Sequence, residues 1–318
     1  EWLSVAYLPM KPETSGSERD VPQFIPLPER ALLVVAGKDA AHFLHNLVTA
    51  NIETLAPGAM RSAALLTPQG KIITEILIAN AGEAGDAEGL FLIDVSFGYA
   101  DDLLSRLAAY KLRAEVTIGH APEGTSVAVL LDAPDYASED IYAFDDPRHA
   151  TLGKRLVGPR DILQSIGEGF ACAEPAAYHL RRVSLGVPEM GKDYPSIDAF
   201  PHEVLLDQLG GVDFRKGCYV GQEVVSRMEH RGSARTRSLP VRFLNGFGVL
   251  GGATVRAGEV TLGSIGESFG DRAIARLRLD KLEDALQSGA EVVAGGVPIS
   301  ASKPDFVTFD VPGVSASS

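Results

Sequence analysis

The chain has 318 residues, of which 45% are hydrophobic and 22% are charged, and its formal net charge is −13. This length suits about two or three globular domains, and no apolar run approaches the ~20 residues that a membrane-spanning helix needs. The acidic balance also argues against direct binding of nucleic acid, because phosphates are bound by Lys and Arg side chains.

The first 28 residues are expected to form a flexible arm. Residues 1–10 lack the basic start and the long apolar core of a secretory signal, and residues 11–28 are rich in Pro, Ser and Glu. The only two cysteines are Cys172 and Cys218, which suits a reducing compartment rather than a disulfide framework. We therefore predict a cytoplasmic protein, in which Cys172, set among small apolar residues, occupies a packed core position.

Strand-like and helix-like patterns alternate through the first part of the chain. In order, they predict a strand at 31–35, a helix at 38–49, strands at 62–66 and 72–78 joined by a turn, a strand at 90–95, a helix at 100–110 and a strand at 112–118. This succession predicts an α+β sheet with helices on one face rather than a doubly wound parallel sheet.

A second set of elements begins near residue 126. It comprises a strand at 126–131, a turn-rich stretch at 132–146, a helix at 176–185 and a helix that starts after Gly221 and ends near His230. Beyond residue 238 the texture changes to short strands separated by Gly-rich turns, at 240–243, 259–265, 274–279 and 297–300. A small β-barrel or sandwich with its boundary near Arg237 is the natural reading.

The segment from Lys216 to Glu223, KGCYVGQE, carries the most specific chemistry. Glycines on both sides of a Cys-Tyr pair let the backbone turn sharply, and a helical pattern follows. Cys218 would lie just ahead of a helix N-terminus with Arg215 and Lys216 beside it, and both features stabilise a thiolate. The plain alternative is a buried, inert cysteine that fills a turn.

Two smaller groups of residues, a basic cluster and a pair of histidines, can be interpreted either as binding sites or as ordinary surface residues. A basic island within an acidic chain is either a solvated helix end or an anion site. Its members are Arg227, His230, Arg231, Arg235 and Arg237. His42 and His45 lie three residues apart on a predicted helix, but no further ligand type accompanies them, so no metal site is predicted there.

The motif KGCYVGQE resembles the signature of the YgfZ branch of the YgfZ/GcvT superfamily, to which the glycine-cleavage T protein also belongs. Similar stretches are LLTPQGK from Leu65, RVSLGVPE from Arg182, FPHE from Phe200 and the pair Arg231-Gly232. The resemblance therefore extends from about residue 31 to about residue 300.

This resemblance implies a fold and a set of partners. Ferredoxin-like, GcvT-type α+β domains at 29–237 would surround a central channel that binds tetrahydrofolate or a derivative, and a β-barrel would occupy 238–318. Family members of this branch support the assembly or repair of iron-sulfur enzymes, and through them tRNA modification. The partners implied are iron-sulfur proteins or their assembly machinery, and the cysteine linked to that role corresponds to Cys218.

The candidate folate-binding residues follow from the same resemblance. They are Arg182, Glu189, Lys216, Tyr219, Gln222, Glu223 and Arg231. Two positions depart from the T protein: Thr74-Glu75 replaces a pair of aspartates, and Ser184 replaces a glutamate that resembles a pterin anchor. Glu75 is then the remaining candidate acid for aminomethyl transfer, and Glu189, Asp193 or Glu203 would have to replace the anchor, or folate would bind more weakly.

Three functions remain open from the sequence. The first is a folate-binding accessory factor for iron-sulfur proteins that works through Cys218. The second is a tetrahydrofolate-dependent aminomethyltransferase or demethylase that uses Glu75, and the third is a protein-interaction module in which folate is incidental.

Overall fold

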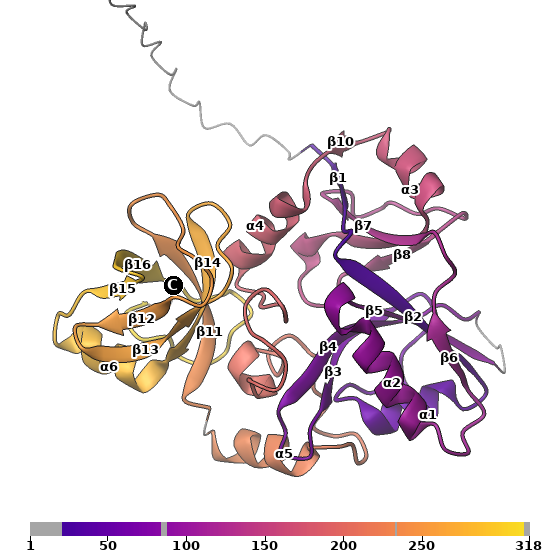
Figure 1. Cartoon of the computed structure of the whole chain (residues 1–318), viewed down its shortest axis with the longest axis horizontal. Coiled ribbons are helices and arrows are strands. Elements are labelled where there is room, and N and C mark those ends of the chain that lie inside the picture. The colour runs from indigo at the N-terminus through magenta and orange to yellow at the C-terminus, as the bar shows by residue number, and fades with distance from the viewer. Residues whose placement is uncertain (1–20, 84–87, 233, 315–318) are drawn as a thin grey trace, which may run out of the picture.

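The computed structural model describes residues 21–83, 88–232 and 234–314, which form two five-stranded sheets and a closed barrel (Figure 1). The strand order of the first sheet is β3-β4-β5-β2-β6, and all neighbours are antiparallel. Its strands are β2 (Arg30–Gly37), β3 (Met60–Leu66), β4 (Ile72–Asn80), β5 (Gly89–Ser96) and β6 (Thr117–His120). The predicted hairpin at 62–78 is confirmed as β3 and β4.

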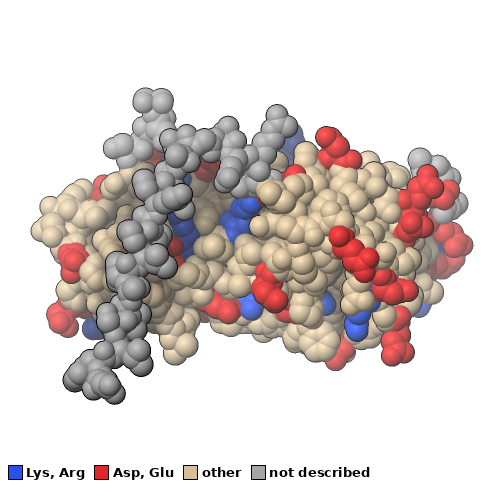
Figure 2. Space-filling model, turned by 90° about the horizontal axis from the view of Figure 1, so that it is seen from above, with Lys and Arg blue, Asp and Glu red and all other residues tan. Residues whose placement is uncertain are grey.

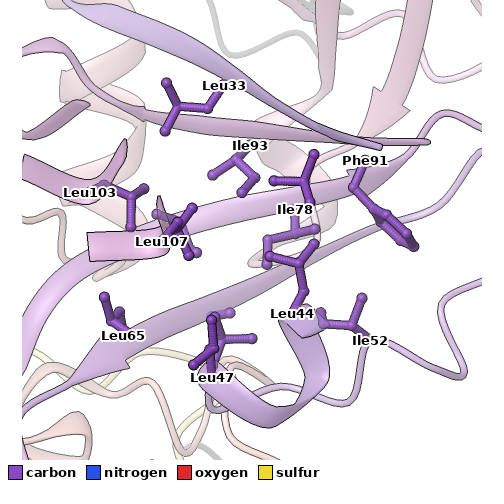
Figure 3. Packing of buried hydrophobic residues seen from close by; sticks show 14 of the residues in the cluster. Leu33, Leu44, Leu47, Ile52, Leu65, Ile78, Phe91, Ile93, Leu103 and Leu107 are labelled. Carbon is purple, nitrogen blue, oxygen red and sulfur yellow. The ribbon is translucent and has the colours of Figure 1, made fainter. Parts of the chain in front are cut away.

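Two helices cover one face of this sheet, as predicted. They are α1 (Ala40–Leu47) and α2 (Ala100–Tyr110), and a short 3-10 helix, η1 (Phe97–Tyr99), leads into α2. Figure 3 shows leucines of both helices in one cluster with Leu33, Ile78 and Ile93 of the sheet. The apolar stripe predicted at residues 38–49 is therefore the face of α1 that packs on the sheet.

The other face of the first sheet packs against a second sheet. The core between them joins Leu32, Leu77 and Leu92 to Val129 and Val157. The second sheet has the order β10-β1-β7-β9-β8. Its strands are β1 (Gln23–Pro26), β7 (Thr125–Leu131), β8 (Tyr142–Asp145), β9 (Lys154–Pro159) and β10 (Ala171–Cys172), with η2 (Ala150–Leu152) between β8 and β9.

Three further helices and a 3-10 helix link the sheets to the barrel. These are α3 (Arg160–Gly167), α4 (Pro175–Leu185), η3 (Pro201–Val204) and α5 (Gln222–Arg231). Helix α3 packs through Leu163 on the outer face of the second sheet, and α4 contacts both this sheet and the barrel. None of the helices in the described part of the chain is both long enough and apolar enough to cross a membrane.

The predicted carboxy-terminal β-barrel is confirmed as a closed barrel of order β11-β14-β13-β12-β15-β16. Its elements are β11 (Thr236–Phe243), β12 (Thr254–Ala257), β13 (Val260–Ile265), β14 (Arg272–Arg278), α6 (Leu279–Gln287), β15 (Val292–Ala294) and β16 (Val297–Ala301). Leu239, Phe243, Leu262 and Leu277 are buried at its centre. Closure leaves no open sheet edge in this part of the molecule.

Several sequence predictions need correction. The strand expected at 112–118 begins only at Thr117, because Leu112 lies in a turn with φ 43° and is 89% exposed. Strands β8, β9, β12 and β15 and helices α3 and α6 were missed, since each has only three to nine residues and a pattern that short does not distinguish a helix from a strand or a turn. Cys172 is exposed rather than buried, because β10 is a two-residue edge strand that pairs only with β1. The expected arm, residues 1–28, lies outside the described residues up to residue 20, and its last part forms β1.

Candidate functional site

The loop that carries Cys218 lies between η3 and α5 and is packed closely against the β3–β4 turn. Gly221 begins α5 with φ 82°, and a Cβ at this position would lie 2.5 Å from the carbonyl oxygen of Thr67. Only glycine therefore allows this approach. Gly221 thus allows the start of α5 to pack against the β3–β4 turn. This turn is part of the LLTPQGK stretch that also resembles the family.

Lys216 holds the same loop against the C-terminal end of α1. Its side chain is buried, and Nζ donates hydrogen bonds to the carbonyl oxygens of His45, Val48 (2.7 Å) and Ala50 (2.8 Å). These carbonyls lie at and just beyond the C-terminal end of α1, where helix geometry leaves acceptors without partners. Burial lowers the pKa of Lys216 to about 8, although Asp213 and Glu53 act in the opposite direction.

Tyr219 provides a second anchor on the other side of Cys218. Its ring is buried in a cluster with Leu66, Ile72 and Val225, and burial raises the pKa of its hydroxyl to about 12. Cys218 itself is exposed between these two fixed residues. The alternative of a buried, inert cysteine is therefore wrong, and the thiol is presented to solvent by a loop whose neighbours are held in the core.

A groove of about 770 Å³ begins three residues before Cys218. It is formed by two segments, one that follows α1 and one that leads into the Cys218 loop, together with Arg61 of β3. Its lining residues are Ala50, Asn51, Thr54, Arg61, Gly210, Val212, Asp213, Phe214 and Arg215. Burial raises the pKa of the Asp213 carboxyl, but hydrogen bonds, including those from the backbone N–H groups of Arg215 and Lys216, leave it below its usual value.

The centre of the molecule holds a separate network of buried ion pairs, which sequence reasoning missed. Arg155 of β9 contacts Asp94 of β5 at 2.7 Å and Asp146, which follows β8, at 3.4 Å. Arg30 of β2 contacts Asp94 at 2.6 Å, and Arg148 contacts Asp146 at 2.7 Å. The signal in the sequence was a charged residue within an apolar strand, as in the stretch FLIDVS around Asp94.

Glu189 and Arg182, two of the predicted folate-binding residues, are part of this network. Glu189 lies 3.6 Å from Arg30, 3.5 Å from Arg148 and 3.8 Å from Arg182. Burial alone would raise the pKa of Glu189, but these three arginines hold it well below its usual range. Arg182 also bonds Asp193 at 2.5 Å, so the chain's own groups pair both residues.

The other predicted folate-binding residues lie elsewhere. Lys216 and Tyr219 hold the Cys218 loop, Gln222 and Glu223 start α5, and Arg231 is exposed at the end of that helix. Glu223 is exposed and lies 4.0 Å from Arg227. The structure therefore divides the predicted set between the central ion-pair network and the Cys218 loop with helix α5 that follows it.

The central space does not fit a pterin ring. The cavity at Glu189 has a volume of about 10 Å³, room for about one water molecule. Glu75, the candidate acid, lines this cavity, but its Oε2 already accepts hydrogen bonds from Met190 N (2.9 Å) and the Tyr194 hydroxyl (2.6 Å). Ser184, at the position of the expected anchor, is exposed on α4.

The proposed substitutes for that anchor are also occupied. Asp193 accepts from Arg182 and from the backbone N–H of Glu189, and Glu203 accepts from the backbone N–H of Phe200 at 2.9 Å. One oxygen of each carboxylate is thus used within the chain, and Asp193 Oδ1 is buried without a hydrogen-bond partner among the described residues, so neither residue offers both of its oxygens to a pterin.

The basic island does not form one site. Arg227, His230 and Arg231 are exposed along α5, whereas Arg237 is buried and donates to both oxygens of Asp207 at 2.9 Å. Asp207 also lies within 4.8 Å of His202 and Glu229, which are potential metal ligands. We assign no metal to this group, because the Arg237 guanidinium opposes a cation at Asp207.

Comparison with known proteins identifies relatives over most of the chain. The human protein "Iron-sulfur cluster assembly factor IBA57, mitochondrial" is 33% identical over 298 residues, which cover 87% of this chain and 83% of that protein. The homologue from Phaeosphaeria nodorum is 32% identical over 240 residues, 73% of this chain and 58% of its own length. The chain thus spans most of the human relative and just over half of the fungal one.

Two further comparisons concern the fold. The profile of the "CAF17, C-terminal beta-barrel domain" family matches residues 235–309. The crystal structure of the glycine cleavage system aminomethyltransferase T from Bartonella henselae superposes with a TM-score of 0.72 at 16% identity, covering 90% of this chain and 86% of the other. The predicted GcvT-type α+β fold with a carboxy-terminal barrel is therefore confirmed.

One prediction is overturned by these comparisons. The relatives from human, Phaeosphaeria nodorum and Mycosarcoma maydis are all named as mitochondrial proteins. Their names point to the mitochondrion, so the predicted cytoplasmic location is wrong. A low cysteine content indicates a reducing compartment but does not distinguish one such compartment from another.

Proposed function

Because the chain belongs to the family of IBA57 iron-sulfur cluster assembly factors, we propose that it takes part in iron-sulfur cluster assembly with Cys218 as its working thiol. The observation that carries the proposal is the exposed position of Cys218 on a loop whose neighbours, Lys216 and Tyr219, are buried. An exposed thiol on a fixed loop suits transient ligation of iron, since iron can reach the sulfur and the thiol loses its proton when it binds the metal.

The number of cysteines supports a role in transfer rather than in permanent storage. An iron-sulfur cluster is usually held by about four cysteine thiolates, and this chain has only two. Cys172 lies on β10 and Cys218 lies just ahead of α5, at opposite ends of the α+β part (Figure 1). Cys218 would therefore contribute a single ligand to a cluster completed by iron-sulfur proteins or their assembly machinery.

Several finer parts of the resemblance stay predictions. These are membership of the YgfZ branch in particular, the indirect effect on tRNA modification and the binding of tetrahydrofolate. Folate would require the network at Glu189 to open, since its cavity holds about one water molecule. Aminomethyl transfer through Glu75 has less support than cluster assembly, because two donors already occupy Glu75 Oε2.

A complementation experiment with the two cysteines as a matched pair tests the proposal. In cells depleted of their own IBA57 protein, the wild-type chain and Cys172→Ser should restore the activity of an iron-sulfur enzyme, whereas Cys218→Ser should not. Both cysteines are exposed, so neither change should unfold the protein. Full restoration by Cys218→Ser would overturn the role of the thiol.

A further inference from the structure

The ligands that complete a cluster bound at Cys218 are usually thiolates, and this chain cannot supply them from its own cysteines. One thiolate leaves about three ligand positions of a cluster open, and the only other cysteine of the chain lies on β10. A partner protein can supply some of these ligands. A small thiol held next to Cys218 can supply another, provided that the surface beside the loop binds it.

The groove described above has the size and place for such a molecule. Its volume of about 770 Å³ falls within the range of roughly 300 to 1,000 Å³ that is usual for small-molecule sites. It includes Arg215, and the Cα atoms of Arg215 and Cys218 are at most about 11 Å apart because three residues of chain connect them. A tripeptide has a similar span, so one molecule can contact the groove and approach the thiol.

The charges in the groove differ from those of the whole protein. Figure 2 shows acidic side chains spread widely over one face of the molecule, in keeping with its net charge of −13. The groove instead presents two arginines and one aspartate. Two guanidinium groups can pair with two carboxylates, and a carboxylate can pair with an ammonium group.

Arg61 and Arg215 differ in how their guanidinium groups are held. Arg61 is held in position by hydrogen bonds from Nη1 to the carbonyl oxygen of Asn51 and to Thr54 Oγ1 (3.0 Å). Arg215 is exposed, and its guanidinium makes no hydrogen bond or ion pair within the described residues. One guanidinium is thus fixed by hydrogen bonds and the other is not, while Asp213 also lines the groove, two residues before Arg215.

We propose that this groove binds a small thiol of the glutathione class, a tripeptide with two carboxylates, one ammonium group and one thiol, next to Cys218. The carboxylates would pair with Arg61 and Arg215, and the ammonium group with the Asp213 carboxylate, whose Oδ1 also accepts from the backbone N–H groups of Arg215 and Lys216. The thiol would then serve as a further cluster ligand and would release its proton to solvent on binding iron. The role of the bound thiol as a cluster ligand rests on the proposed function. Binding of the tripeptide to the groove can be measured without a cluster.

Calorimetric titration of the full chain with S-methylglutathione, which cannot form a disulfide, tests the site. We expect saturable binding to the wild type that is weakened at least fivefold by Arg215→Gln and by Arg61→Gln. Arg113→Gln is the control, because it removes the same charge from an exposed turn elsewhere and should leave binding unchanged. Glutarate, a dicarboxylate without the peptide, should bind more weakly.

Each contrary outcome has a distinct meaning. No saturable binding, or an equal loss in Arg113→Gln, would overturn the site, and equal binding of glutarate would reduce it to a general anion site. If S-methylglutathione does not bind while Cys218→Ser still abolishes restoration of the iron-sulfur enzyme, the groove proposal fails and the proposed function stands. If it binds while Cys218→Ser restores the enzyme fully, the proposed function fails and the groove remains a thiol site without a role in cluster ligation.

Discussion

The buried arginines at the centre and the buried lysine under the Cys218 loop satisfy their charges in different ways. Arg155 faces two carboxylates, those of Asp94 and Asp146, whereas Lys216 faces three neutral carbonyl oxygens. Opposite charges keep a buried ion charged, while carbonyl groups provide only partial compensation for burial. The arginines of the central network therefore stay charged and have a structural role. Lys216, which holds the Cys218 loop, can lose its proton near pH 8.

The largest expected effect lies in the central network. Arg155→Ala should leave Asp94 and Asp146 buried with fewer partners and lower the free energy of unfolding by about 3–5 kcal/mol. Urea denaturation followed by circular dichroism measures this change. The control is Arg242→Ala, which breaks an exposed pair with Asp271 and should hardly alter the midpoint. Equal shifts in both variants would contradict the special role of the centre.

A smaller effect is expected at the anchor of the loop. Lys216→Met keeps much of the side-chain volume but leaves three carbonyl oxygens of the α1 end without this donor, which should cost about 1–3 kcal/mol. Hydrogen exchange should increase in residues 213–221 and at the end of α1 more than in the barrel. Lys111→Met, on a more exposed turn, is the matched control. Uniform exchange across the chain would show that Lys216 does not hold this loop in particular.

The difference in charge compensation also predicts a dependence on pH. Burial lowers the pKa of Lys216 from its ordinary value of 10.5 to about 8 in the folded chain. Between these values the unfolded chain binds the extra proton, so the contribution of Lys216 to the free energy of unfolding should rise with pH across this window and be constant below pH 8. Unfolding curves of the wild type minus those of Lys216→Met isolate this contribution. A falling difference would contradict the assignment.

The smallest expected effect concerns the thiols. Cys218→Ser should change the free energy of unfolding by no more than about 0.5 kcal/mol, because the side chain is exposed. Iodoacetamide should modify both Cys218 and Cys172 in the folded protein, and mass spectrometry can count the adducts. A thiol that reacts only after unfolding would contradict its exposed position.

The contacts of Arg182 and Glu189 show what the sequence leaves undetermined. Their predicted binding of folate stays a prediction, and in the structure they pair with Arg30, Arg148 and Asp193, which come from different elements of the fold. A resemblance indicates which residue types occur at given positions. It does not reveal whether the chain's own side chains fill the space that a ligand would otherwise take.

Local sequence patterns were sufficient to predict many of the single helices and strands and the motif, because hydrophobic periodicity and glycine placement act over a few residues. The hairpin at β3 and β4, helix α2, the KGCYVGQE segment and the barrel strands β11, β13, β14 and β16 follow from such patterns. Only the tertiary structure decided that Cys218 is exposed, that the centre is closed by ion pairs, and that Lys216 binds Val48, 168 residues away. Burial and charge pairing depend on which segments, distant in the sequence, lie together in the fold. Local sequence patterns do not determine this.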